Sequence, residues 1–304
     1  MATWTWDRWK KLLGLMLLPV VSFGMLRWFE YRNVYQPTAT LWVEPDVLGR
    51  PVEEIWLTSR DGARLNAWFF PAATESPRRH LAVLHCHGNG GNMSHRLDVA
   101  EALLATGVNV LLFDYRGYGR SAGRPSEEGT YLDAQAGCAW LRERGFAPSN
   151  IIAFGESLGG GVATELALRE PLGGLALQST FTSIPDIGAE LFPWLPVRWL
   201  ASIHYDTRAK LPRVHVPVLV MHSRADTLIP FAHAERNFAV ANEPKLLHEI
   251  AGNHNDFLEV GRVPFIEGFQ SLLRIVESPR ALPNAETPAP VPESSLEPEP
   301  PSAP

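Results

Sequence analysis

Short apolar runs alternate with amphipathic stretches over residues 52–276, and this alternation predicts the order of the elements. Runs with strand character are 52–58, 64–70, 81–86, 108–113, 151–154, 175–178, 218–222 and 246–250. Stretches with helical spacing are 94–106, 127–144, 158–169, 231–240 and 256–276. Apolar strands that alternate with helices are typical of a mostly parallel sheet with both faces covered. We therefore expect an α/β fold whose first two strands form an antiparallel hairpin.

The interval 181–213 interrupts this alternation. It contains Phe-Pro-Trp-Leu-Pro at 192–196 as well as Trp199, and it lies between the sixth and seventh predicted strands. Apolar sequence divided by prolines is typical of short helices and turns. We expect a short cap here, which is also a candidate lid.

The first 35 residues differ from the rest of the chain. An apolar run at 12–26 has two lysines shortly before it, Arg27 after it and tryptophans at both ends. As a helix this run reaches about 22 Å, against about 30 Å for the core of a bilayer. Extending the run to 9–29, with the basic side chains reaching outward, closes the gap. We expect an uncleaved single-pass membrane anchor, with an interfacial helix or a cleaved signal as the alternatives.

The domain organisation follows from these segments. We expect the anchor over 1–35, one large domain over 36–278 and a disordered tail over 279–304, where nine of 26 residues are proline. Such a tail cannot bury enough apolar surface to offset its ordering entropy. More basic residues precede the apolar run than follow it, which favours a cytoplasmic N-terminus and a large domain outside the cytoplasm.

Composition narrows the classes of function. The 304 residues, 45% of them hydrophobic, suffice for one large α/β domain. The formal net charge of -6 and the lack of a basic cluster do not indicate a nucleic-acid partner. Cys86 and Cys138 fall in a predicted strand and a predicted helix without metal-ligand spacing, so we expect two buried free thiols. Nothing calls for a metal or a cofactor, and nothing indicates an oligomeric state.

A candidate nucleophile lies between a predicted strand and a predicted helix. The sequence Gly-Glu-Ser-Leu-Gly at 155–159 follows the strand at 151–154 and opens the helix at 158–169. This is the strand, sharp turn and helix context of a nucleophile elbow, which lifts the hydroxyl of Ser157 toward a substrate carbonyl. The pentapeptide alone is weak evidence, because a glycine-rich turn can have a purely structural role.

The partners that such a serine needs follow in the chain. A serine hydroxyl requires a base, and the base requires an acid that orients it. Asp226 follows the seventh predicted strand and His254 follows the eighth. Because the carboxyl ends of parallel strands lie on one rim of a sheet, we expect Ser157, Asp226 and His254 to converge there. Asp114 also ends a strand and is the rival for the acid, although it is better placed to hold its own loop.

An acyl-transfer site also needs two amide donors for the oxyanion of the tetrahedral intermediate. One is expected to be the NH of Leu158, directly after the nucleophile. The other is expected in the loop His-Gly-Asn-Gly-Gly-Asn at 87–92, where three glycines allow the backbone amides to turn inward. We choose the NH of Asn89 for this second donor, with a plain glycine-rich turn as the alternative.

These motifs together resemble a known family. The segments 87–92, Phe-Asp-Tyr-Arg-Gly-Tyr-Gly-Arg-Ser at 113–121 and Gly-Glu-Ser-Leu-Gly-Gly at 155–160 are similar to those of the Bem46-like α/β hydrolases. This group includes the membrane-anchored α/β hydrolase domain 13 and 17 proteins. The resemblance covers about 52–276 and implies an eight-stranded sheet, a serine esterase mechanism without a cofactor and often an N-terminal anchor. Some members are protein depalmitoylases, but this chain lacks their cysteine-rich N-terminus.

The leading hypothesis is a serine hydrolase that cleaves carboxylic esters or thioesters, with a small-molecule or lipid acyl ester as substrate. A peptidase or aminopeptidase of the same fold is the first alternative. A catalytically silent scaffold on a hydrolase fold is the second, and the Ser157, Asp226 and His254 set argues against it.

Overall fold

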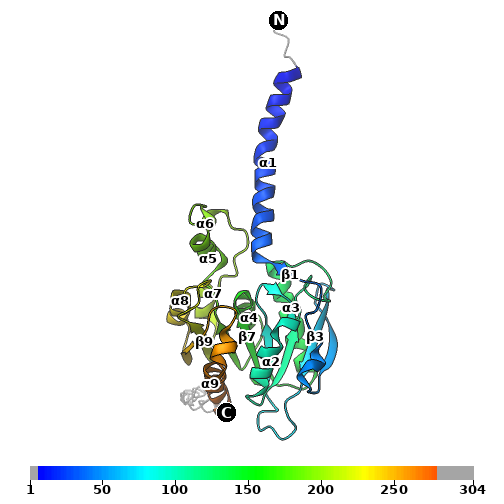
Figure 1. The fold of residues 1–304 in the computed structure, drawn as a ribbon, viewed down its shortest axis with the longest axis vertical. Coiled ribbons are helices and arrows are strands. Elements are labelled where there is room, and N and C mark those ends of the chain that lie inside the picture. The colour runs from blue at the N-terminus through cyan, green and yellow to red at the C-terminus, as the bar shows by residue number, and fades with distance from the viewer. Residues whose placement is uncertain (1–5, 279–304) are drawn as a thin grey trace, which may run out of the picture.

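A sheet of eight strands forms the centre of the protein (Figure 1). We describe a computed structural model over residues 6–278, with side chains from residue 18 onward. The predicted tail at 279–304 lies outside the described residues. The strands of the sheet are β2 (Glu53–Thr58), β3 (Arg64–Phe70), β4 (Ala82–Cys86), β6 (Asn109–Phe113), β7 (Ile151–Glu156), β8 (Gly174–Gln178), β9 (Val218–Ser223) and β10 (Lys245–Ile250).

The strand order is β10-β9-β8-β7-β4-β6-β3-β2. All neighbouring pairs from β10 to β6 are parallel, whereas β3 runs antiparallel to both β6 and β2. The predicted α/β fold, with eight mostly parallel strands and an initial hairpin, is confirmed. Each predicted strand is present, within two residues of its expected bounds.

Helices cover both faces of the sheet. The main ones are α2 (Leu97–Leu104), α3 (Glu127–Glu143), α4 (Leu158–Arg169), α8 (Ala232–Val240) and α9 (Phe257–Glu277). Buried side chains of α2 and α9 pack on one face, and those of α3, α4 and α8 pack on the other. Because both faces are covered, the central strands β4, β6, β7 and β8 are buried throughout, which explains their continuous apolar sequence.

The interval between β8 and β9 is the segment for which a cap is predicted, and we refer to it as the cap. It contains α5 (Ile184–Leu191), α6 (Val197–Leu200), α7 (Thr207–Lys210) and a short turn at Leu211–Arg213. In Figure 1, α5 and α6 rise beside the lower part of the N-terminal helix. The cap therefore lies next to the first element of the chain rather than standing alone.

The N-terminal helix α1 (Trp6–Val34) projects from the body of the protein (Figure 1). Its last turns pack against the cap, because Glu30 accepts hydrogen bonds from the NH groups of Ser202 and Ile203 at 2.6 and 3.0 Å. Tyr35, directly after the helix, is 1% exposed and lies in the core, with its hydroxyl 3.0 Å from that of Tyr205. The end of α1 thus belongs to the folded domain.

The prediction of a single-pass anchor, with the large domain outside the cytoplasm, is wrong. Within residues 6–278, no helix is both long enough and apolar enough to cross a membrane. Helix α1 has sufficient length, with 29 residues, but its apolar run at 12–26 is short. Extending that run adds Lys10, Lys11 and Arg27, and the side chain of Arg27 donates to the Leu200 carbonyl and pairs with Glu30.

Candidate active site

Ser157 occupies a strained turn between β7 and α4. Its backbone has φ 53° and ψ -115°, in a region that residues other than glycine rarely adopt. The turn fits only because the residues two positions before and after Ser157 are glycines. A Cβ on Gly159 would lie 1.9 Å from the Cys86 carbonyl oxygen, and one on Gly155 would lie 2.4 Å from the carbonyl oxygen of Gly159. The glycines of the pentapeptide therefore allow the close approach of α4 to β4 and β7.

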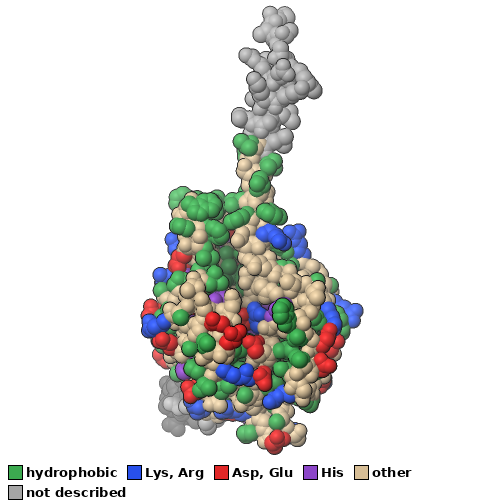
Figure 2. All heavy atoms as spheres, in the orientation of Figure 1, with side chains coloured by type: hydrophobic (Ala, Val, Ile, Leu, Met, Phe, Trp, Pro, Cys, Tyr) green, Lys and Arg blue, Asp and Glu red, His purple; other side chains and the backbone are tan. Residues whose placement is uncertain are grey.

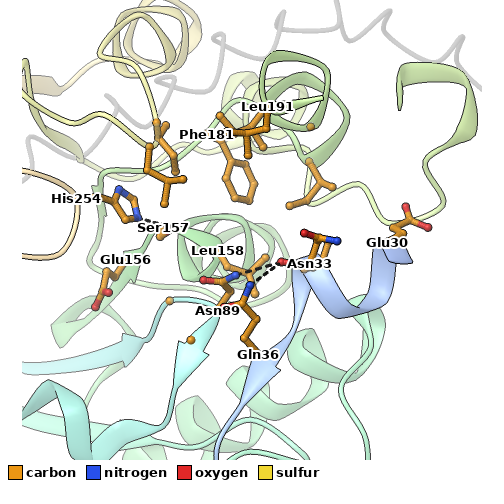
Figure 3. Close-up of a pocket in the computed structure, with 18 of the residues that line it drawn as sticks. Glu30, Asn33, Gln36, Asn89, Glu156, Ser157, Leu158, Phe181, Leu191 and His254 are labelled. Atoms are coloured by element: carbon orange, nitrogen blue, oxygen red, sulfur yellow. Dashed lines mark hydrogen bonds between the residues drawn. The ribbon is translucent and has the colours of Figure 1, made fainter. Parts of the chain in front are cut away.

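The structure brings Ser157, His254 and Asp226 into one chain of contacts. Ser157 Oγ lies 3.1 Å from His254 Nε2, and His254 Nδ1 lies 2.7 Å from Asp226 Oδ2. Figure 3 shows the His254 ring directed toward Ser157. A histidine that donates from Nδ1 to the carboxylate presents an unprotonated Nε2 to the serine hydroxyl. All three side chains follow carboxyl ends of strands, namely β7, β9 and β10.

The Asp226 carboxylate is held by further donors. Its Oδ1 accepts from the NH groups of Leu228 and Ile229 at 2.9 and 2.8 Å. Burial alone would raise the pKa of Asp226, but hydrogen bonds from His222 and His254 outweigh it and hold that pKa well below its usual range. The carboxylate is therefore ionised at neutral pH and can stabilise a histidine cation.

The rival carboxylate, Asp114, has different contacts. Its Oδ1 accepts from the NH of Met93 at 2.7 Å and lies 3.5 Å from His87 Nε2. A Cβ on Gly119 would collide with Asp114 Oδ2 at 2.0 Å, so the loop of Asp114 folds tightly over it. Asp114 therefore holds the loops that follow β4 and β6.

The loop after β4 contains Asn89, whose NH is predicted to be the second oxyanion donor. His87 Nδ1 donates to the Gly88 carbonyl oxygen at 2.7 Å. That oxygen and the NH of Asn89 belong to one planar trans peptide, so fixing the carbonyl also fixes the direction of the NH. The NH of Leu158 is the first of α4, where amides have no acceptor within the helix. Figure 3 shows Asn89 and Leu158 close to each other, below Ser157.

The residues after α1 brace this loop, which the sequence did not reveal. Strand β1 (Gln36–Pro37) pairs in parallel with β5 (Gly90–Gly91). The NH of Gln36 donates to the Asn89 carbonyl at 3.1 Å, and Asn89 Nδ2 reaches the Asn33 carbonyl at 3.4 Å. Strands of two residues have no periodicity, so no sequence signal could have predicted this pairing.

A buried ion pair lies beside the nucleophile. Arg96 Nε donates to Glu156 Oε2 at 2.7 Å, and Glu156 is 8% exposed. Burial would raise the pKa of Glu156, but the charge of Arg96 outweighs it and leaves that pKa well below its usual range. A Cβ on Gly88 would lie 3.1 Å from Glu156 Oε1, so this ion pair lies directly against the loop after β4. The sequence placed Glu156 in the elbow but gave no signal for its partner.

Replacing Glu156 by glutamine is expected to lower the free energy of unfolding by about 1–3 kcal/mol at pH 7, because it leaves Arg96 without its counter-charge. The pKa of Glu156 is depressed in the folded state, so its stabilisation is present above the unfolded pKa of about 4.3 and is lost as the pH falls below it. Urea unfolding at pH 7 and pH 3 should show a smaller difference between the two proteins at pH 3.

The matched control for this change is Glu249→Gln. Glu249 pairs with Arg224 on the surface, where the side chains are 54% and 63% exposed. An exposed pair of this kind contributes about 0–1 kcal/mol. Equal unfolding free energies for Glu156→Gln and the unchanged protein would contradict a stabilising role for the buried pair.

A cavity of about 840 Å³ opens above Ser157. This volume lies toward the upper end of the roughly 300–1,000 Å³ typical of small-molecule sites. Its walls come from α1, the loop after β4, α2 and the cap, and Ser157, Leu158 and His254 all line it. Within residues 6–278 no group of three or more histidine, cysteine or acidic side chains is arranged to hold a metal ion.

Comparison with known proteins identifies the class. Residues 77–209 match the family model described as "Serine aminopeptidase, S33". An esterase of Pyrococcus furiosus has the same fold, with a TM-score of 0.64 at 23% identity over 80% of this chain and 97% of its own. The sheet order, the elbow after β7 and this likeness define an α/β hydrolase.

Two curated relatives narrow the class further. The α/β hydrolase domain-containing protein WAV2 of Arabidopsis thaliana is 32% identical over 73% of this chain and 79% of its own. The protein bem46 of Schizosaccharomyces pombe is 32% identical over 72% of this chain and 77% of its own. The chain therefore belongs to the Bem46-like α/β hydrolases.

Proposed function

We propose that this α/β hydrolase cleaves carboxylic esters or thioesters through an acyl-enzyme formed on Ser157. The observation that carries the proposal is the unbroken contact from Ser157 Oγ to His254 Nε2 at 3.1 Å and from His254 Nδ1 to Asp226 Oδ2 at 2.7 Å. These distances lie within hydrogen-bond reach, which proton transfer requires.

The reaction has two halves. His254 Nε2 takes the hydroxyl proton while Ser157 Oγ bonds to the substrate carbonyl carbon, and Asp226 stabilises the imidazolium. The bond to the leaving group then breaks, and His254 returns the proton to the departing alcohol or thiol. In the second half His254 takes a proton from water, whose oxygen attacks the acyl carbon. The bond between that carbon and Ser157 Oγ then breaks, and His254 returns the proton to Ser157 Oγ, which releases the acid.

The NH groups of Asn89 and Leu158 bind the oxyanion in both halves. Two features support this assignment. The His87 contact with the Gly88 carbonyl orients the Asn89 amide before substrate arrives, and the Leu158 amide stands at the positive end of the α4 dipole. Donors oriented in advance need no reorganisation when charge develops, and losing one typically costs about 3–4 kcal/mol of transition-state stabilisation.

An aminopeptidase is the second candidate, because the matching family model carries that description. An aminopeptidase needs an anion that binds the substrate ammonium group. Glu156 lines the cavity next to Ser157, but its carboxylate is already paired with Arg96. Asp98 also lines the cavity, and its Oδ1 already accepts from the NH of Val99 at 2.8 Å. Both features favour an ester over a peptide with a free amino group.

Treatment of the full-length protein with a fluorophosphonate tests the nucleophile directly. We expect a stoichiometric adduct that peptide mass spectrometry locates on Ser157, and turnover of p-nitrophenyl butyrate that greatly exceeds that of leucine p-nitroanilide. Faster turnover of the anilide would favour the aminopeptidase. A folded protein that forms no adduct would instead be a silent scaffold.

A further inference from the structure

Two helix faces oppose each other above Ser157. From α1 the cavity lining includes Leu26, Phe29, Glu30 and Asn33, spaced i, i+3, i+4 and i+7, together with Arg27 and Val34. From α5 it is lined at the same spacing by Ile184, Ile187, Gly188 and Leu191. This spacing places each set on one side of its helix. Figure 2 shows hydrophobic side chains on both sides of the hollow between α1 and the cap.

The two walls also contact each other directly. Phe29 and Phe192 meet edge to face, with ring centroids 5.3 Å apart. The carboxylate of Glu30 accepts from the backbone of Ser202 and from its hydroxyl, the latter at 2.7 Å. Helix α1 is thus fixed against the cap by its own side chains, and the hollow between them has a defined width.

The two charged side chains of the α1 wall, Arg27 and Glu30, pair with each other. Arg27 donates to the Leu200 carbonyl and pairs with Glu30 at 2.9 Å, and Asn33 Nδ2 donates to the Phe29 carbonyl at 2.8 Å. A charged substrate group would therefore find no unpaired counter-charge on this wall, whereas an apolar chain would bury surface against it.

The cavity is polar at its other end. His95, Arg96 and Asp98 line it there, near Glu156. In Figure 3, His254 and Glu156 lie on one side of Ser157, and Asn33 and Glu30 of α1 lie on the other. A substrate whose carbonyl carbon sits at Ser157 would thus direct its apolar part toward α1 and its polar part away from it.

We propose that the hollow between α1 and α5 binds the acyl chain of an ester or thioester with about eight or more carbons, and that the N-terminal helix determines this chain-length preference. The proposal rests on the ester hydrolysis proposed above. It assigns to α1 a substrate-binding role, with Leu26 and Phe29 as the side chains that contact the chain.

Hydrolysis of p-nitrophenyl butyrate and octanoate by the full-length protein tests the proposal, with both esters kept below the concentration at which they aggregate. A buried methylene contributes up to about fourfold in kcat/KM, so we expect octanoate to exceed butyrate by at least about tenfold. Leu26→Trp, which fills the hollow, is expected to lower kcat/KM for octanoate by about tenfold and to leave butyrate within about twofold.

The matched control is Met25→Trp. Met25 precedes Leu26 on the same helix but is 64% exposed and does not line the cavity, so the same new ring should change neither rate. Butyrate turnover reports that each variant is folded. Equal kcat/KM for the two esters would overturn the proposed acyl site, and so would a Leu26→Trp protein with an unchanged ratio of the two values. Neither result would contradict ester hydrolysis at Ser157. If the unchanged protein hydrolysed neither ester, the proposed function itself would be overturned.

Discussion

Replacing Ser157 by alanine is expected to lower kcat for p-nitrophenyl butyrate by at least about 10³-fold. The alanine protein keeps the NH groups of Asn89 and Leu158 and the cavity, but it has no oxygen that can form the acyl-enzyme. Steady-state hydrolysis measures the loss, and circular dichroism checks that the protein is folded. Any remaining turnover should lack the initial burst of nitrophenol that an accumulating acyl-enzyme produces.

The control for this change is Ser271→Ala. Ser271 lies on α9, where its hydroxyl donates to the Glu267 carbonyl at 2.9 Å, remote in the fold from the carboxyl ends of the strands. Removing this hydroxyl should leave kcat unchanged. If Ser157→Ala retained a tenth or more of the activity, hydrolysis would proceed through another group and the proposed nucleophile would be wrong.

The positions of the strands along the chain and the candidate site residues could be predicted for the same reason. Buried parallel strands need continuous apolar sequence, so their ends are visible, and Ser157, Asp226 and His254 each follow such an end. Parallel strands bring those ends to one rim, which places residues that are 69 and 28 positions apart within reach. The close contacts of Gly155 and Gly159 were visible as glycines at fixed offsets from the serine.

The packing of the last turns of α1 could not be predicted, because the pattern of this helix permits more than one partner. An apolar helix face indicates burial but does not reveal whether lipid or protein covers it. Two contacts show that the last turns of α1 pack on protein: Glu30 accepts from the backbone of Ser202, and Phe29 meets Phe192. The residues in each pair are more than 160 positions apart. No local rule connects such residues, and the same holds for the Arg96 and Glu156 pair. Contacts between distant loops and helices are therefore where sequence reasoning failed.

Replacing Asp226 by asparagine is expected to lower kcat by about 10⁴-fold, while the cavity and the NH groups of Asn89 and Leu158 stay in place. The asparagine amide is nearly the same size as the carboxylate, but it carries no charge to stabilise a histidine cation. It can also donate to His254 Nδ1 and so favour the tautomer that has its proton on Nε2, where Ser157 needs an acceptor. The 2.7 Å contact between His254 and Asp226 makes this effect direct.

The pH dependence separates this explanation from a simple loss of stability. Because the pKa of Asp226 is depressed in the folded protein, its carboxylate stays charged well below pH 4, and its stabilisation is lost only as the pH falls below the unfolded value of about 3.9. Between pH 6 and 8 the charge of Asp226 does not change, so a pH shift in this range does not alter its contribution to stability. The activity of Asp226→Asn should remain low throughout this range, even where thermal unfolding shows that the protein is folded. Asp114→Asn, which changes the rival carboxylate, should lower kcat by no more than about a hundredfold, against about 10⁴-fold for Asp226→Asn. A larger loss from Asp114→Asn than from Asp226→Asn would instead assign the acid to Asp114, since only the group that contacts the histidine can act on its tautomer and its charge.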